Sequence, residues 1–145
     1  MERNFDLYEH QAQYYETDQM GIVHHSNYIR WMEEARLALL DAQSLSYAEM
    51  EQMGLLIPVL NVSCNYKLPF RYGETFKIQV YPKFFNGVKC VFGYNMYGED
   101  GTLRNTAESA HCFTDVNIKP VMLKKSHPGI YEPLKKWADE NKVEE

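Results

Sequence analysis

Residues 28–43, YIRWMEEARLALLDAQ, predict a long helix around which the rest of the fold is expected to form. The stretch contains no Gly or Pro, and four apolar residues recur at the spacing of one helical face. These residues are Tyr28, Met32, Ala35 and Leu39. Ile29, Leu37 and Leu40 add apolar surface outside that stripe, so we expect a long helix that is covered on more than one side. Ser26 or Asn27 is expected to cap its first turn, because a short polar side chain can accept from the unpaired amides there.

Beyond Gly54 the apolar pattern changes to a period of two, which predicts strands. This pattern covers residues 60–64, 76–81, 89–97 and 102–116. Asn86-Gly87 and Asp100-Gly101 separate the last three of these stretches, and such pairs favour tight hairpin turns. A looser alternation over residues 5–14, which includes Phe5 and Leu7, predicts one earlier strand.

One long helix and five antiparallel strands define an α+β domain in which a sheet wraps the helix. We expect a single domain over residues 1–145, because no repeat, linker or low-complexity tract interrupts the chain. A shorter helix over residues 46–53 and a terminal helix from Pro128 complete the predicted elements. A helix that is apolar nearly all round also predicts that a second subunit finishes part of the sheet or helix.

The composition of the 145 residues excludes several classes of protein. With 45% apolar and 24% charged residues, and no apolar stretch near the ~20 residues of a membrane span, a soluble globular protein is expected. The net charge of −5 argues against a general nucleic-acid binder. Cys64, Cys90 and Cys112 form no CxxC pair, which argues against a zinc site and is typical of a reducing cytosol. Because the N-terminus also lacks a secretory signal, we expect a cytoplasmic protein.

The chemistry of the chain is concentrated in residues 15–28, YETDQMGIVHHSNY, since the GxSxG, HExxH, Walker A and GxGxxG signatures are absent. Asp18 falls in a turn shortly before the expected helix start, where free backbone amides keep a carboxylate ionised. The same amides can stabilise an oxyanion on a bound carbonyl. The alternative is a structural Asp18 that caps its own loop. His24 and His25 lack further ligands for a metal, and His25 can orient a substrate or cap the helix.

Basic residues gather in the stretch 116–131, which contains no acid. They are Lys119, Lys124, Lys125 and His127. Such a run is suited to a phosphate-bearing small molecule, although a solvated surface turn explains the same pattern.

The motif around Asp18 resembles the hotdog-fold acyl-CoA thioesterases, and most closely the 4-hydroxybenzoyl-CoA and Tol-Pal-associated subgroup. The chain matches the pattern Y-x-x-T-D-x-x-G-x-V-x-x-x-x-Y without a gap, and Glu33 and Arg36 supply the E-x-x-R on the helix behind it. The likeness extends more loosely through Pro58-Val59 and Asn65-Tyr66 to Lys119-Pro120.

This resemblance implies a hotdog fold that forms homodimers or homotetramers with active sites at the subunit interface. It implies hydrolysis of acyl-CoA to the free acid and coenzyme A, with Asp18 as nucleophile or general base and a helix-start amide as oxyanion donor. No metal or cofactor is expected, and coenzyme A enters only as part of the substrate. The substrate-binding candidates near the motif are His25, Ser26, Asn27 and Tyr28, and Val59 is a further one. Lys119, Lys124 and Lys125 are candidates by position and charge for the phosphates of coenzyme A, and the resemblance itself does not assign them.

Three other functions use the same features. An acyl-acyl carrier protein thioesterase would differ only in its leaving thiol, and a non-catalytic hotdog protein would bind an acyl ligand without turnover. Hotdog dehydratases place a His on the loop and an acid on the helix, and His24, His25, Glu33 and Glu34 supply those residue types. The T-D-x-x-G pattern nevertheless favours the thioesterase.

Overall fold

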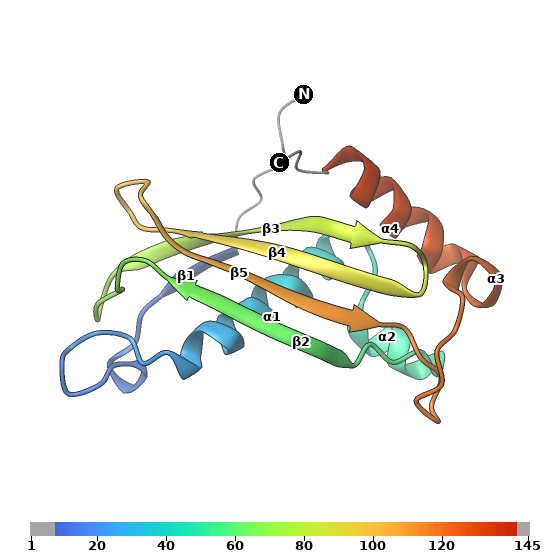
Figure 1. Cartoon of the computed structure of the whole chain (residues 1–145), viewed down its shortest axis with the longest axis horizontal. Helices are drawn as coiled ribbons and strands as arrows, with labels where there is room; N and C mark the ends of the chain where they lie inside the picture. The colour runs from blue at the N-terminus through green and yellow to red at the C-terminus, as the bar shows by residue number, and fades with distance from the viewer. Residues whose placement is uncertain (1–7, 142–145) are drawn as a thin grey trace.

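The computed structural model describes residues 8–141, which form a five-stranded antiparallel sheet with helices packed against it (Figure 1). The predicted α+β class, a five-stranded sheet around one long helix, is confirmed. In chain order the elements are β1 (Tyr8–Gln11), the 3-10 helix η1 (Tyr14–Glu16), α1 (Ser26–Ala42), α2 (Tyr47–Gln52), β2 (Val59–Tyr66), β3 (Thr75–Phe85), β4 (Lys89–Tyr97), β5 (Leu103–Cys112), α3 (Leu123–Ser126) and α4 (Pro128–Glu140).

The start of α1 differs from the prediction in one respect. The residue before its first turn is His25, and no side chain caps it, so the predicted cap at Ser26 or Asn27 is wrong. Both side chains have other partners: Ser26 Oγ lies 2.9 Å from His24 Nδ1, and Asn27 Nδ2 donates to the backbone oxygen of Glu16. The first strand ends at Gln11 rather than at Tyr14, and Phe5 and Leu7 lie outside the described residues.

The sheet has the strand order β1-β3-β4-β5-β2, and every neighbouring pair is antiparallel. The two predicted hairpin turns join β3 to β4 and β4 to β5. Gly87 and Gly101 adopt φ of 87° and 82°, a left-handed conformation that glycine adopts without steric cost. Asn86 closes the first turn, since its Oδ1 accepts from the amides of Val88 and Lys89.

Helix α1 lies along one face of the sheet and buries its apolar stripe there (Figure 1). Trp31 is buried, and its ring centroid lies 4.3 Å from that of Phe76 on β3. The opposite side of the helix is covered less than the sequence predicts, because Ile29 is 48% exposed and Leu37 is only half-buried. Within residues 8–141, no helix combines the length and apolar character that a membrane crossing requires.

Strand β2 forms one edge of the sheet, and its only strand neighbour within the described residues is β5. Apolar side chains on this edge strand are left in the open: Val59, Leu60 and Tyr66 are each about half exposed. An eight-residue edge with exposed apolar side chains offers both main-chain hydrogen bonds and apolar area to a further strand. We therefore expect the second subunit that the sequence predicts to pair at β2.

Candidate active site

Asp18 is held in a closed loop between η1 and α1. Thr17 and Val23 form an isolated antiparallel bridge at the base of the loop, and the Asp18 amide donates to the Ile22 oxygen at 2.8 Å. Gly21 occupies the left-handed position that this turn requires, with φ 77°. The loop is therefore a hydrogen-bonded turn that fixes the backbone of Asp18.

The two carboxylate oxygens of Asp18 have different roles. Oδ1 accepts from the Met20 amide at 2.8 Å, which is the self-capping turn that the structural alternative describes. No partner for Oδ2 occurs among residues 8–141, and the side chain is half-buried at a pocket. Asp18 thus serves its own loop with one oxygen and leaves the other available.

The pocket beside Asp18 has a volume of about 330 Å³ and lies between three segments: the Asp18 loop, the first turn of α1, and the chain that follows β2. Its lining residues are Asp18, Met20, Ile22, Val23, His25, Tyr28, Tyr66, Lys67, Leu68 and Pro69. Tyr28 and Tyr66 meet edge to face with ring centroids 4.9 Å apart. Burial raises the pKa of both phenols to about 12, so both hydroxyls stay protonated at neutral pH.

One backbone amide at the start of α1 remains free to donate. The amides of His24, Ser26, Asn27 and Tyr28 all have acceptors within this turn or on Glu16. The His25 amide has none in the part of the chain that the structure describes, and His25 lines the pocket. An unpaired N–H at a helix start is the type of group that stabilises an oxyanion.

The structure brings only some of the predicted site residues together. Asp18, His25 and Tyr28 share the pocket. Ser26 is exposed beside His24, and the Asn27 side chain is buried against backbone oxygens, so neither lines the pocket.

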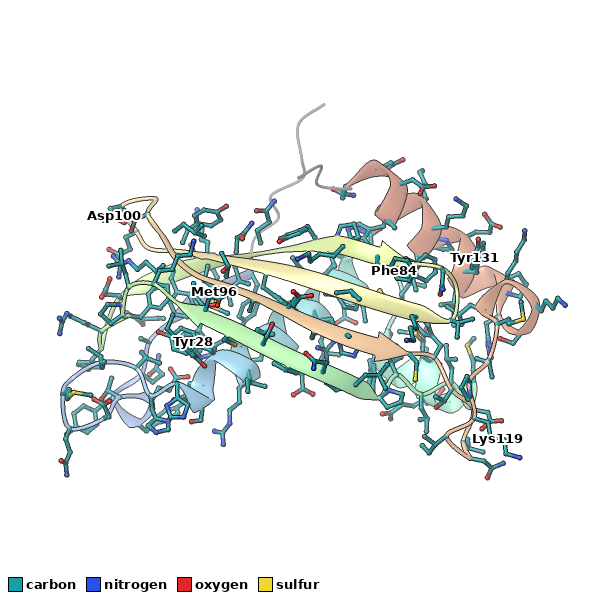
Figure 2. All side chains as sticks on the ribbon, viewed as in Figure 1. Tyr28, Phe84, Met96, Asp100, Lys119 and Tyr131 are labelled. Carbon is teal, nitrogen blue, oxygen red and sulfur yellow. The ribbon has the colours of Figure 1, made fainter. Side chains whose placement is uncertain are left out.

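The remaining predicted residues lie at the other end of the sheet within the same chain. Val59 begins β2, Lys119 belongs to the loop after β5, and Lys124 and Lys125 lie on α3. Figure 2 shows Lys119 and Tyr28 near opposite ends of the sheet. A single chain therefore does not place these residues at the pocket.

The segment 66–69 lines the pocket but lies outside the Asp18 motif, and the sequence did not predict any of its residues as part of the site. The amides of Lys67 and Leu68 both donate to the Arg104 oxygen at 3.0 Å, which turns the chain back over the pocket after β2. The signal for Tyr66 was present, since it continues the alternation of Val62 and Cys64 toward the helix side of the sheet. Nothing in the sequence pattern marked Lys67 or Pro69.

The two adjacent histidines do not form a metal centre in the structure. Their rings stack with centroids 4.2 Å apart, and His24 Nδ1 is engaged with Ser26 Oγ. In the described ranges, no group of three or more His, Cys, Asp or Glu side chains is arranged to hold a metal ion.

A pocket at a helix start, beside a carboxylate and under a wrapped sheet, is the arrangement of a thioesterase-type hotdog domain. The chain belongs to the thioesterase-like superfamily, whose profile matches residues 13–137, and the predicted family is confirmed. It is 41% identical over 132 residues to the putative acyl-CoA thioesterase YneP of Bacillus subtilis, and the alignment covers 88% of this chain and 96% of that protein. It is 30% identical to the acyl-CoA thioester hydrolase YbgC of Escherichia coli O157:H7, over 78% of this chain and 86% of that protein. Among solved structures, a DHNA-CoA thioesterase from Staphylococcus aureus superposes with a TM-score of 0.88 at 31% identity, over 95% of both chains.

Proposed function

We propose that this protein hydrolyses acyl-CoA thioesters to the free acid and coenzyme A, with Asp18 as the catalytic carboxylate. The observation that carries the proposal is the pairing, on one pocket, of a free Asp18 oxygen with the unpaired amide of His25. Membership of the thioesterase-like superfamily and the acyl-CoA names of YneP and YbgC support the same reaction.

The two groups are sufficient for the chemistry of a thioester. Asp18 either attacks the carbonyl carbon itself or takes a proton from the water that attacks, and in both routes the carbonyl oxygen becomes negative. The His25 N–H donates to that oxygen at the positive end of α1. The C–S bond then breaks, and the electron pair leaves with the thiolate of coenzyme A, a good leaving group that needs no metal. When water attacks, the free acid forms directly. When Asp18 attacks, a water molecule then hydrolyses the acyl–Asp18 anhydride, which releases the acid and restores the carboxylate.

The acyl group occupies the pocket in this proposal. Its walls are mainly apolar and aromatic, with Tyr28 and Tyr66 as neutral phenols, so a carbon chain or ring is accepted and a charged tail is not. Lys67 at the same pocket supplies a cation for the polar part of the substrate.

A second copy completes the site. When two β2 edges pair antiparallel about a two-fold axis, the start of one strand lies beside the end of the other. Tyr66 and the pocket lie at the end of β2, whereas Val59 lies at its start. Lys119 lies beside that start, because Pro120 bridges to Thr114 and Thr114 bridges to Leu56. Lys124 and Lys125 lie on α3, at the same end of the sheet (Figure 1). Lys119, Lys124 and Lys125 of the second copy are then the candidates that bind the phosphates of coenzyme A. Further pairing into a homotetramer and a cytoplasmic location stay predictions.

The test is thiol release from a panel of short, long and aromatic acyl-CoAs. We expect wild type to turn over, and Asp18→Asn to lose more than about 100-fold in kcat, or ~2.7 kcal/mol of barrier. Asp41→Asn is the matched control, because Asp41 is exposed near the other end of α1, and it keeps the wild-type rate. Unchanged kcat/KM in Asp18→Asn would remove Asp18 from the mechanism.

The same assay, extended to acyl-acyl carrier protein and to acyl-CoA binding, separates two of the alternative functions from the proposed one. Turnover of acyl-acyl carrier protein but of no acyl-CoA indicates a carrier-protein thioesterase. Binding of acyl-CoA without release of thiol from either substrate indicates a non-catalytic acyl-binding protein.

A further inference from the structure

We propose that Glu16 is a positioning residue that fixes Asp18 relative to the start of α1. The inference rests on the proposed function, since it concerns the placement of the carboxylate that acts in hydrolysis. Glu16 is 5% exposed, although it lies only two residues from an open pocket loop.

The carboxylate of Glu16 connects three separate segments. Oε2 accepts from the indole Nε1 of Trp31 on α1 at 2.7 Å, a hydrogen bond that is fully buried. Oε1 accepts from the Gln13 amide at 2.8 Å and lies 2.9 Å from Nε2 of His10 on β1. Sheet edge, loop entry and helix are therefore joined through one side chain.

The backbone oxygen of Glu16 closes the Asp18 loop. It accepts from the His24 amide at 2.8 Å and from Asn27 Nδ2 at 2.9 Å. Asn27 Nδ2 also reaches the His24 oxygen at 3.3 Å. Both ends of the loop that carries Asp18 are thus fixed to the first turn of α1, where the His25 amide lies.

These contacts require a carboxylate at position 16. The Gln13 amide and the Trp31 indole present N–H groups to the side chain, and His10 presents a third when its proton is on Nε2. Only an ionised acid accepts from all three. Burial favours the neutral acid, but the hydrogen bonds from His10, Gln13 and Trp31 together outweigh it and lower the pKa of Glu16. A glutamine would place an NH₂ group against one of these donors.

Loss of the Glu16 contacts should lower the rate of hydrolysis, because this rate depends steeply on the positions of the reacting groups. A displacement of about 1 Å at a reacting group costs on the order of 100-fold in rate, even when the change lies away from the chemistry. Loosening the loop moves Asp18 relative to the His25 amide, but it leaves in place the walls that Tyr28 and the segment 66–69 supply. The rate of the chemical step should therefore fall more than substrate binding.

The test compares Glu16→Gln with Glu51→Gln, an exposed position on α2 where the same chemical change touches no network. We expect kcat of Glu16→Gln to fall about 10- to 100-fold, with KM within about twofold. The indole N–H resonance of Trp31, one of two tryptophan indole signals in the ¹H–¹⁵N spectrum, should shift. Glu51→Gln should change neither quantity.

A second pair of variants leaves the Glu16 carboxylate in place. His10→Phe removes the donor to Oε1 and should lower kcat, whereas His10→Gln keeps an N–H near the same position and should restore it. This pair of variants tests whether Glu16 positions Asp18 even if Glu16→Gln does not fold.

The proposal is overturned if Glu16→Gln is folded, shows a shifted Trp31 resonance and keeps the wild-type kcat. It is equally overturned if His10→Phe and His10→Gln have the same kcat, or if either change raises KM alone. Full activity in Asp18→Asn would instead contradict the proposed function, so the two failures are distinguishable.

Discussion

Asp18 stabilises a turn with one oxygen, and in the proposed function it reacts with the other. Its Oδ1 stabilises the loop through the Met20 amide, and an asparagine keeps that acceptor while losing the negative charge. Asp18→Asn is therefore a clean probe of the charge, whereas Asp18→Ala also removes the turn hydrogen bond. The structural interpretation of this residue describes Oδ1, and the proposed catalytic role falls to Oδ2.

Asn105 is a second residue with an unusual environment. It is 0% exposed on β5, cross-strand from Met96 and Tyr66, and neither Nδ2 nor Oδ1 has a hydrogen-bond partner among the described residues. A buried amide without partners costs free energy that an apolar side chain of similar size does not.

We therefore expect Asn105→Leu to raise the free energy of unfolding by about 1 kcal/mol, measured by urea denaturation. Asn105→Ala is the control for volume and should be less stable than Asn105→Leu, because it leaves a cavity. A loss of stability in Asn105→Leu would show that the amide has a partner in the native protein.

At the scale of elements, local signals identified the helix and the hairpins well. The periodicity of residues 28–43 and the Asn86-Gly87 and Asp100-Gly101 pairs depend on neighbours in sequence, and the structure follows them closely. The cap of α1 was missed because Ser26 is engaged by a histidine two residues earlier, a preference that composition does not reveal.

The exposed edge of β2 gives the prediction at this scale. Leu60→Lys places a cation on both copies at the proposed shared edge, so we expect the dimer to dissociate in sedimentation velocity. Phe84→Lys is the matched control, since Phe84 is similarly exposed (49% against 53%) but lies on β3, inside the sheet order. A monomeric wild type, or an unaltered Leu60→Lys dimer, would contradict pairing through β2.

For the whole molecule, the fold could be predicted from sequence more completely than the site. Asp18, His25 and Tyr28 share one motif, so local reasoning found them together. The segment 66–69 reaches the pocket only after the sheet has formed. The proposed role of Glu16 depends on a contact with Trp31, fifteen positions later in the chain. The basic residues of the loop after β5 and of α3 lie far from the pocket in one chain, so their proposed part in binding coenzyme A depends on a second copy.

The buried histidine of β5 makes the stability of the whole molecule depend on pH. His111 is 0% exposed, its Nε2 lies 2.7 Å from Ser109 Oγ, and burial lowers its pKa to about 4, with the Arg36 cation acting in the same direction. The unfolded chain takes up a proton near pH 6.5, whereas the folded chain does so only near pH 4. The contribution of neutral His111 to the free energy of unfolding is therefore fully present above pH 6.5, and it is lost as the pH drops from 6.5 to 4.

We expect a loss of about 1 kcal/mol per pH unit in that window, measured as the free energy of unfolding in urea. His111→Gln should flatten the profile between pH 6.5 and 5. An equally steep profile in that variant would assign the dependence to another group.

In the proposed mechanism, Asp18 supplies the chemistry and does not hold the substrate. Acyl-CoA binding and turnover should therefore be measured on one sample of folded Asp18→Asn protein, beside wild type. We predict a dissociation constant within about twofold of wild type and a kcat more than about 100-fold lower. Wild-type turnover in that sample, or a loss confined to binding, would exclude this role for Asp18.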